Sequence, residues 1–204
     1  METKNHWENV FTTKNACEVS WTQKFPKATM EFIRLIQLPK NASIIDVGSG
    51  ESHLAEALLN DGYTNITVLD ISKTALEKAK KRLDAKSDLI QWEVADITDF
   101  RTNNTFDFWN DRAVFHFLTK ASDVKKYKLA INKAMKLKGH FLLGTFSENG
   151  PKKCSGLEIK QYSEKEMKAC FSENFTEIKC FTENHLTPSG TTQHFQYCGF
   201  AKTK

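Results

Sequence analysis

The stretch SIIDVGSGESHLAEAL (residues 43–58) decides the fold of this chain. A β-branched, apolar run ends at Asp46 and Val47, and Gly48 and Gly50 follow one residue apart. Glycines packed this tightly after a strand let the backbone turn sharply and approach a ligand closely. The residues after the turn have the apolar spacing of a helix. The stretch therefore predicts a strand over residues 43–47, a turn that faces a ligand, and a helix over residues 52–60.

Strand patterns and helix patterns alternate outward from this stretch. Helices are predicted over residues 28–38, 73–83 and 124–136 and around residues 167–171. Strands are predicted over residues 66–70, 89–94, 105–109 and 140–145, the last entered through a turn at Gly139, and two extended segments follow over residues 175–182 and 193–202. This alternation is typical of an α/β fold with a doubly wound, mostly parallel sheet. The two closing strands have no helix between them, so one of them must run antiparallel.

The length of 204 residues fits a single domain over residues 1–204. Its core is expected over residues 28–204, because residues 1–27 stand outside the alternation. The formal net charge is +4, with lysines spread along the chain, and nothing in it indicates a nucleic-acid partner. No apolar run approaches the ~18 residues of a membrane span, and the start METKNHWENV has no signal-peptide core. We therefore expect a cytoplasmic protein without membrane contact.

The five cysteines show no CxxC spacing. In a reducing cytosol we expect all five to be free thiols. The sequence thus predicts neither a disulfide framework nor a metal site.

Three carboxylates mark the ends of successive predicted strands. Asp46 precedes the glycine turn, Asp70 closes the second strand, and Asp96 follows the third. In an open α/β sheet the ligand lies beyond the carboxyl ends of the strands, at the switch point beside the first one. An ammonium group, a ribose diol and an adenine amine would match these acids in that order. S-adenosylmethionine carries all three groups and no phosphate.

A dinucleotide dehydrogenase is the competing interpretation of the same turn. It is disfavoured because His53 stands where the third glycine of G-x-G-x-x-G belongs. Asp46, two residues before the first glycine, would also repel a pyrophosphate.

The sequence resembles the class I S-adenosylmethionine-dependent methyltransferases. The resemblance rests on DVGSG, VLDI, ADI and FDFWNDRAVFHFL, which occur in this order and cover residues 43–147. It implies a Rossmann-like, seven-stranded sheet of order 3-2-1-4-5-7-6 with the seventh strand antiparallel. The strings GPKKCSGL and FHFLT are similar to those of a group of small bacterial methyltransferases. The N-terminus is similar to that of thiopurine methyltransferase and its relatives.

The resemblance also implies which residues hold the cofactor. Asp46 and the glycine turn would line its methionine and ribose, Asp70 would hold the ribose hydroxyls, and Asp96 with Ile97 would hold the adenine. Taken alone, Asp70 could instead cap the next helix and Asp96 could be a turn acid. The full expected cofactor set is Trp7, Asp46, Gly48, Ser49, Gly50, Asp70, Ile71, Asp96, Ile97, Asn110 and Asp111.

Candidates for work on the methyl acceptor follow the fourth strand. His116 has a pKa suited to a general base, but it could equally pack the next helix. Arg112 could bind a substrate carboxylate, although pairing with Asp111 or another core acid is the favoured interpretation. Cys154 could handle a soft acceptor or simply fill space in a loop. The expected substrate-binding set is Trp21, Arg112, His116 and Cys154.

Residues 1–27 carry Trp7, Phe11 and Trp21 among polar residues. These aromatic residues either pack on the first helix or form a lid over the cofactor, which is the arrangement that the resemblance favours. The leading interpretation is a methyltransferase for a small molecule with a sulfur or nitrogen nucleophile, present as a monomer or homodimer. A protein lysine methyltransferase and a non-catalytic cofactor-binding module are the alternatives.

Overall fold

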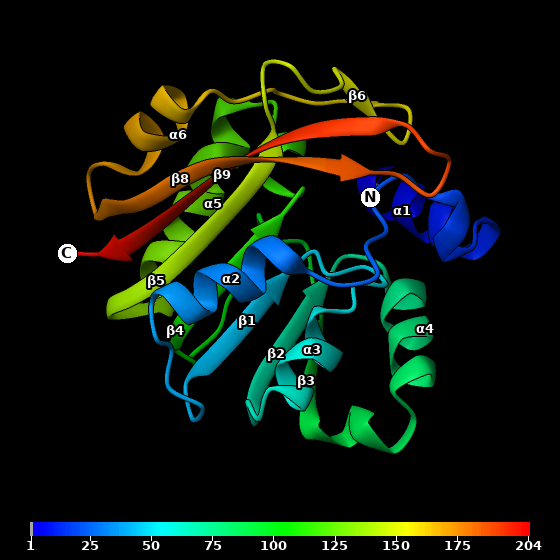
Figure 1. Ribbon diagram of the computed structural model, residues 1–204, viewed down its shortest axis with the longest axis horizontal. Helices are drawn as coiled ribbons and strands as arrows, with labels where there is room; N and C mark the ends of the chain where they lie inside the picture. Colours follow the sequence, from blue (N-terminus) through cyan, green and yellow to red (C-terminus); the bar gives the residue numbers. More distant parts are fainter. Residues whose placement is uncertain (1) are drawn as a thin grey trace.

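The computed structural model describes residues 2–204, which form one seven-stranded sheet covered by helices on both faces (Figure 1). Its strands are β1 (Ser43–Val47), β2 (Asn65–Asp70), β3 (Ile90–Val94), β4 (Phe106–Arg112), β5 (Met135–Phe146), β8 (Phe175–Leu186) and β9 (Thr192–Lys202). The strand order is β3-β2-β1-β4-β5-β9-β8. Strand β9 runs antiparallel to both of its neighbours, and the other strand pairs are parallel. The predicted fold class, strand order and antiparallel closing strand are confirmed.

Each face of the sheet has its own apolar core, because successive side chains of a strand point to opposite faces. Ile44, Phe108 and Leu142 pack with α2 (Lys27–Leu35) and α3 (Leu54–Asn60), which lie in front of the sheet in Figure 1. Ile45 and Trp109 pack on the other face with α5 (Ala121–Ala134) and α6 (Glu164–Phe171). The inner strands β1, β2 and β4 are therefore buried on both sides, and their polar ends are left for the ligand site.

The glycine turn leads from β1 into α3, and β2 leads into α4 (Lys73–Leu83). The Ser72 Oγ accepts a hydrogen bond from the Ala75 N–H at 3.1 Å, so the predicted cap of α4 is present. The short elements are three 3₁₀ turns at Ala16–Glu18, Asp84–Leu89 and Phe115–Phe117, and the hairpin of β6 (Lys153–Cys154) and β7 (Leu157–Glu158). None of the helices formed by residues 2–204 is both long and apolar enough to cross a membrane.

Several predicted boundaries differ from the structure, and two of the differences have a local cause. Helix α2 ends at Leu35 rather than residue 38, because Gln37 takes a left-handed conformation with φ of 51°. Gly139 lies inside β5 at an irregularity where Lys138 has φ of 63°, and not in a turn before the strand. No helix was predicted within residues 1–27, but residues 2–13 form the helix α1 (Glu2–Thr13), which lies beside α4 (Figure 1).

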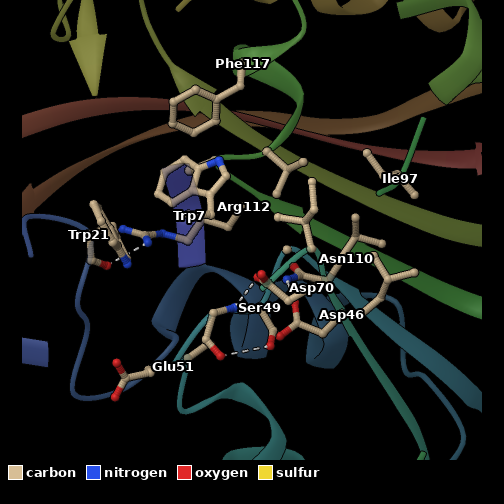
Figure 2. Close-up of a pocket in the computed structure, with 18 of the residues that line it drawn as sticks. Trp7, Trp21, Asp46, Ser49, Glu51, Asp70, Ile97, Asn110, Arg112 and Phe117 are labelled. Carbon is tan, nitrogen blue, oxygen red and sulfur yellow. Dashed lines mark hydrogen bonds between the residues drawn. The ribbon is translucent and has the colours of Figure 1, made fainter. Parts of the chain in front are cut away.

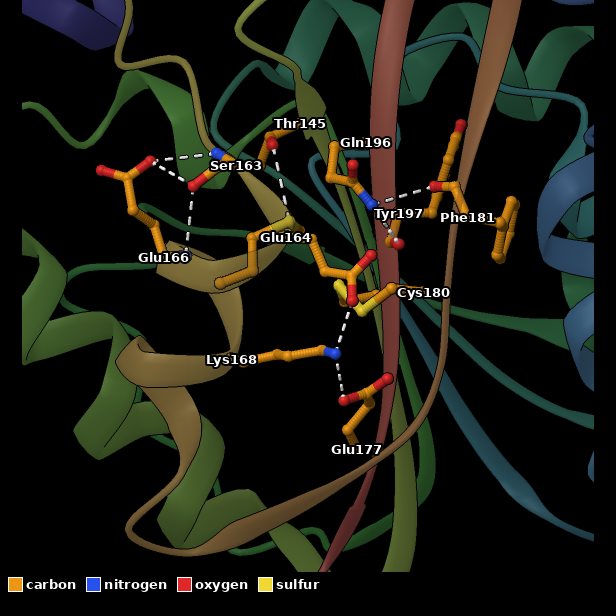
Figure 3. The surroundings of a disulfide bond; sticks show 12 residues. Thr145, Ser163, Glu164, Glu166, Lys168, Glu177, Cys180, Phe181, Gln196 and Tyr197 are labelled. Atoms are coloured by element: carbon orange, nitrogen blue, oxygen red, sulfur yellow. Dashed lines mark hydrogen bonds and ion pairs between the residues drawn. A yellow bond between two sulfur atoms is a disulfide. The ribbon is translucent and has the colours of Figure 1, made fainter.

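The expectation of five free thiols is wrong for two of them. Cys180 on β8 and Cys198 on β9 face each other in the antiparallel register and are joined by a disulfide (Figure 3). A separation of 18 residues gave no sign of this pairing, because only the hairpin register places the two Cα atoms 4.1 Å apart. Beside this bond, Glu164 and Glu177 approach each other, and the Lys168 ammonium pairs with both, at 2.5 Å and 2.6 Å. A cation thus already sits between these two acids.

Candidate functional site

A cavity of about 370 Å³ opens at the carboxyl ends of β1, β2 and β4. This volume lies within the range of small-molecule sites. Helix α1 and residues 21–29 close the side opposite the strands. Figure 2 shows the acidic groups Asp46 and Asp70 at one end of the cavity and the aromatic rings of Trp7, Trp21 and Phe117 at the other.

Most of the residues predicted for the site are brought together here. Of the 15, 13 line the cavity: Trp7, Trp21, Asp46, Gly48, Ser49, Gly50, Asp70, Ile71, Asp96, Ile97, Asn110, Arg112 and Cys154. The two others, Asp111 and His116, are buried behind the lining.

The glycine turn is shaped by its own packing as well as by the open space beside it. Gly48 and Gly50 have φ of +63° and +54°, a region that side chains with a Cβ rarely adopt. A Cβ at Gly48 would overlap the side chain of Val114, and a Cβ at Gly50 would lie 3.0 Å from the Phe11 ring. The absence of a Cβ at both positions therefore leaves room for neighbouring side chains, one of which comes from α1. It also leaves bare backbone as part of the cavity wall.

Asp46 is held in place by a chain of buried hydrogen bonds. The Thr29 hydroxyl on α2 donates to the Asn110 Oδ1 at 3.0 Å, and the Asn110 Nδ2 donates to the Asp46 Oδ1 at 2.7 Å. The Asp46 Oδ2 is buried and has no partner among the described residues. Burial raises the pKa of Asp46 to about 7, against the lowering effect of the Asn110 hydrogen bond. The site thus contains one oriented carboxylate with a free oxygen, ready for a cationic donor.

Asp70 ties the glycine turn to the end of β2. Its Oδ2 accepts from the Gly50 N–H and its Oδ1 from the Ser72 N–H, both at 2.8 Å. Burial raises the pKa of Asp70 to about 6. The Ser72 contact is a turn that precedes α4, and the first N–H groups of that helix are capped by Ser72 and Glu8 instead. Each oxygen of Asp70 retains a lone pair for a ligand hydroxyl.

Asp96 forms a local turn at the next strand end. Its Oδ1 accepts from both the N–H and the hydroxyl of Thr98 at 2.8 Å. Ile71 and Ile97 add apolar surface to the cavity lining that includes this acid. This combination of apolar surface and one acid suits an apolar group with one polar edge.

The opposite end of the cavity is aromatic. The Trp7 ring from α1 lies edge-on to Trp21 and Phe117, with centroid distances of 5.8 Å and 5.1 Å. Cys154 of the β6–β7 hairpin is buried beside this cluster, and burial raises the pKa of its thiol to about 11. At neutral pH Cys154 is therefore a neutral, small apolar group.

Helix α1 is anchored by Glu8. The Glu8 carboxylate accepts from the Lys73 N–H at 2.7 Å, the Ser72 hydroxyl at 2.9 Å and the Thr74 N–H at 3.1 Å. It thus caps the start of α4 from outside that helix. These hydrogen bonds outweigh burial and lower the pKa of Glu8 to about 2.

Asp111 and His116 have structural surroundings. The Asp111 carboxylate accepts from the Tyr127 hydroxyl at 2.7 Å and from the Val114 N–H at 3.0 Å. The His116 Nδ1 accepts from the Phe146 N–H at 3.2 Å, and burial lowers the pKa of the ring to about 3. Both residues fix the segment after β4 against the sheet.

Sequence reasoning missed Glu8, Thr29 and Phe117. The one available signal concerned Thr29, a polar residue on the buried face of an apolar helix. Phe117 adjoins the histidine that drew attention, but the 3₁₀ turn directs the phenyl ring, not the imidazole, into the cavity. Nothing in the sequence relates Glu8 to a helix start more than 60 residues away.

Comparison with known proteins gives a family for most of the chain. Residues 38–198 match the model of a family described as a methyltransferase domain. This range includes the three strand-end acids and all of the sheet except residues 199–202 of β9.

Two curated relatives differ in what they modify. The chain is 22% identical over 156 residues to human EEF1A lysine methyltransferase 2, covering 69% of this chain and 66% of the relative. It is 30% identical over 138 residues to the ubiquinone/menaquinone biosynthesis C-methyltransferase UbiE of Zymomonas mobilis, covering 65% and 54%. The chain thus spans slightly less than two thirds of the length of one relative and about half of the other.

Solved structures share the fold at low identity. A protein solved in work on the conversion of a disulfide bond into a thioacetal group in echinomycin biosynthesis has a TM-score of 0.78 and 18% identity, covering 98% of this chain and 93% of that one. The 1,6-didemethyltoxoflavin-N1-methyltransferase of Burkholderia thailandensis, bound to S-adenosylhomocysteine, has a TM-score of 0.70 and 15% identity, covering 100% and 85%. The N-methyltransferase NodS of Bradyrhizobium japonicum, also bound to S-adenosylhomocysteine, has a TM-score of 0.69 and 18% identity, covering 89% and 90%.

Proposed function

This chain belongs to the methyltransferase domain family, and from that premise we propose that it transfers the methyl group of S-adenosylmethionine to a small molecule, with sulfur or nitrogen favoured as the acceptor atom. The observation that carries the proposal is the free, buried Oδ2 of Asp46 in a cavity whose far end is aromatic. The family assignment and the neighbours bound to S-adenosylhomocysteine support S-adenosylmethionine as the cofactor.

The residues at the strand ends fit this cofactor. The Asp46 Oδ2 would accept from the ammonium of its methionine part, which gives that unpartnered oxygen a donor. The remaining lone pairs of Asp70 would accept from the ribose hydroxyls, and the free Oδ2 of Asp96 would accept from the adenine amine between Ile71 and Ile97. Gly48, Ser49 and Gly50 would lie along the ribose and the methionine.

When bound, S-adenosylmethionine supplies a methyl group that its sulfonium already activates. The chain's own task is then to orient the acceptor and exclude water. Trp7, Trp21 and Phe117 can do both, because their rings form the cavity wall opposite the strand-end acids. Residues 1–27 act as a lid in this proposal, with α1 anchored by Glu8.

His116 takes no part in this proposal, although its pKa range in water suits a general base. Its ring lies outside the cavity lining, one nitrogen accepts a backbone hydrogen bond, and its lowered pKa leaves it neutral. Asp111 is likewise assigned to structure rather than to the cofactor.

A protein lysine methyltransferase is the second candidate, favoured by the similarity to EEF1A lysine methyltransferase 2. Incubation with labelled S-adenosylmethionine and a lysate separates the two functions. Label in the small-molecule fraction supports the proposal, and label confined to protein lysines refutes it in favour of the alternative.

Cofactor binding is tested by thermal unfolding with S-adenosylmethionine, S-adenosylhomocysteine or NAD. A ligand at ~100 times its dissociation constant stabilises the fold by about 2.7 kcal/mol, or about 5–10 °C for a domain of this size. We expect shifts with both adenosyl compounds and none with NAD. No shift with either adenosyl compound would contradict the proposal.

A further inference from the structure

Arg112, at the end of β4, is a cation without a counter-ion. Its Nε donates to the Tyr197 hydroxyl at 3.1 Å and its Nη1 to the Trp21 carbonyl at 2.9 Å. The Phe195 ring lies 4.6 Å from the Cζ. The Nη2 is buried and has no hydrogen-bond partner among residues 2–204. Two donor hydrogens on one nitrogen are therefore unused.

The expected pairing of Arg112 with a core acid is not found. Among the described residues, no carboxylate oxygen lies within 4.0 Å of its guanidinium nitrogens. Asp111 is committed to Tyr127 and to backbone N–H groups. The charge of Arg112 opposes the rise that burial causes in the pKa of Glu183, but the hydrogen-bond partner of the Glu183 Oε1 is Gln23, at 3.2 Å. Removing a cation from water without a partner is costly, so a ligand that supplies the anion would be stabilised here.

The charge of Arg112 contrasts with that of the cofactor end. Asp46, Asp70 and Asp96 line that end, whereas the groups in direct contact with the Arg112 guanidinium are neutral: the Tyr197 hydroxyl, the Trp21 carbonyl and the Phe195 ring. Trp21 lies directly beside the guanidinium, and Cys154 is a neutral thiol on the same side of the cavity. A ligand here meets flat apolar walls and one positive charge.

We propose that the methyl acceptor is a small molecule with a flat apolar body and a carboxylate that pairs with Arg112. The inference rests on the proposed function and names the substrate class of the same site. The two free hydrogens of Nη2 suit a carboxylate, which pairs with guanidinium in a directional, charge-assisted way. Because Nη2 is buried, contact requires side chains of the cavity wall to change rotamer and uncover it, and such changes are common on binding.

The test uses the full chain saturated with S-adenosylhomocysteine, so that cofactor binding is measured first. The probes are benzoate, phenylacetate and indole-3-acetate, each compared with its amide by calorimetry or tryptophan fluorescence at pH 7.5. The amides keep the shape and remove the charge. We expect at least one carboxylate to bind at least tenfold more tightly than its amide.

Variants assign this preference to one residue. Arg112→Gln should abolish the preference for the carboxylate, and Arg112→Lys should retain part of it. Arg34→Gln, which changes an exposed arginine of α2 outside the cavity, is the matched control and should bind like the unaltered chain.

The outcomes distinguish the two proposals. Failure to bind S-adenosylhomocysteine refutes the proposed function itself. If the cofactor product binds but no carboxylate binds, or the amides bind equally well, only the inference about Arg112 is overturned. The comparison of carboxylate with amide is made on the unaltered chain, so it stands even if Arg112→Gln does not fold.

Discussion

Asp46→Asn should raise stability and lower cofactor affinity at the same time. The Asn110 Nδ2 can still donate to the side-chain oxygen of the new residue, so the hydrogen-bond chain from Thr29 survives. The variant amide replaces the oxygen that has no partner. The substitution thus exchanges a buried charge for a neutral amide whose donor hydrogens lack a partner, and burying the neutral group costs less.

The stability effect follows from the raised pKa of Asp46. Below the unfolded value of 3.8 the carboxyl is neutral in both states and contributes nothing. As pH rises, the unfolded chain ionises first, and folding carries a growing cost until the pH passes the folded pKa of about 7. At 1.36 kcal/mol per pKa unit, the shift sets an upper limit of about 4 kcal/mol. We expect Asp46→Asn to gain about 1–4 kcal/mol at pH 8 and almost nothing at pH 4.

The affinity effect has the opposite sign. Loss of a charge-assisted hydrogen bond to the ammonium costs about 1.5–3 kcal/mol, or roughly 10- to 150-fold in the dissociation constant of S-adenosylhomocysteine. In the unaltered chain, affinity should also fall as pH drops below about 7, because Asp46 then takes up a proton.

Urea unfolding at pH 4 and pH 8 and calorimetric titration between pH 6 and pH 8 measure both effects. A variant that is no more stable than the unaltered chain at pH 8 would refute the burial argument. Unchanged affinity at pH 8 would refute the placement of the ammonium.

Three further predictions concern the contacts around the cavity. Glu8→Gln should lower the unfolding free energy by about 1–2 kcal/mol at pH 7 because it weakens the external cap of α4, whereas Glu2→Gln, in the exposed first turn of α1, should not. The difference between the two variants should shrink as pH falls from 4.5 toward the folded pKa of about 2, and equal denaturant midpoints at pH 7 would contradict the prediction. Asp70→Ala should weaken S-adenosylhomocysteine binding by about 1–3 kcal/mol in calorimetry, and an unchanged dissociation constant would show that the ribose lies elsewhere. Thr29→Val, which frees the Asn110 amide, should lower affinity several-fold with little change in melting temperature, and a large melting shift without a loss of affinity would assign Thr29 to packing alone.

The fold was largely predictable because its signals are local and periodic. Each strand and helix has its own apolar pattern, and short connections determine which elements pack as neighbours. The strand-end acids were found for the same reason, since topology alone brings the ends of parallel strands together. Strand register and contacts between residues far apart in the sequence were not predictable. Cys180 meets Cys198 through the hairpin alignment, and Glu8 contacts α4 only once the rest of the fold has formed.

The partners of Arg112 show a second limit of sequence reasoning. An arginine beside an aspartate in NDR suggests an ion pair, yet adjacent strand residues point to opposite faces. Asp111 therefore turns toward Tyr127 on α5, and Arg112 toward Tyr197 on β9. The alternation of side chains along β4 places the Arg112 guanidinium in the cavity wall. That it has no counter-ion among the described residues can be determined only from the folded structure.

The position of β9 sets an order of assembly during synthesis. This strand comes after all the others in the chain but lies between β5 and β8 in the sheet. Until residues 192–202 have left the ribosome, β5 has no partner on that side, and the guanidinium of Arg112 lacks both Tyr197 and Phe195. The acids at the ends of β1 and β2 lie on strands that are synthesised early. The half of the cavity assigned to the cofactor can therefore take shape on the nascent chain before the half assigned to the acceptor.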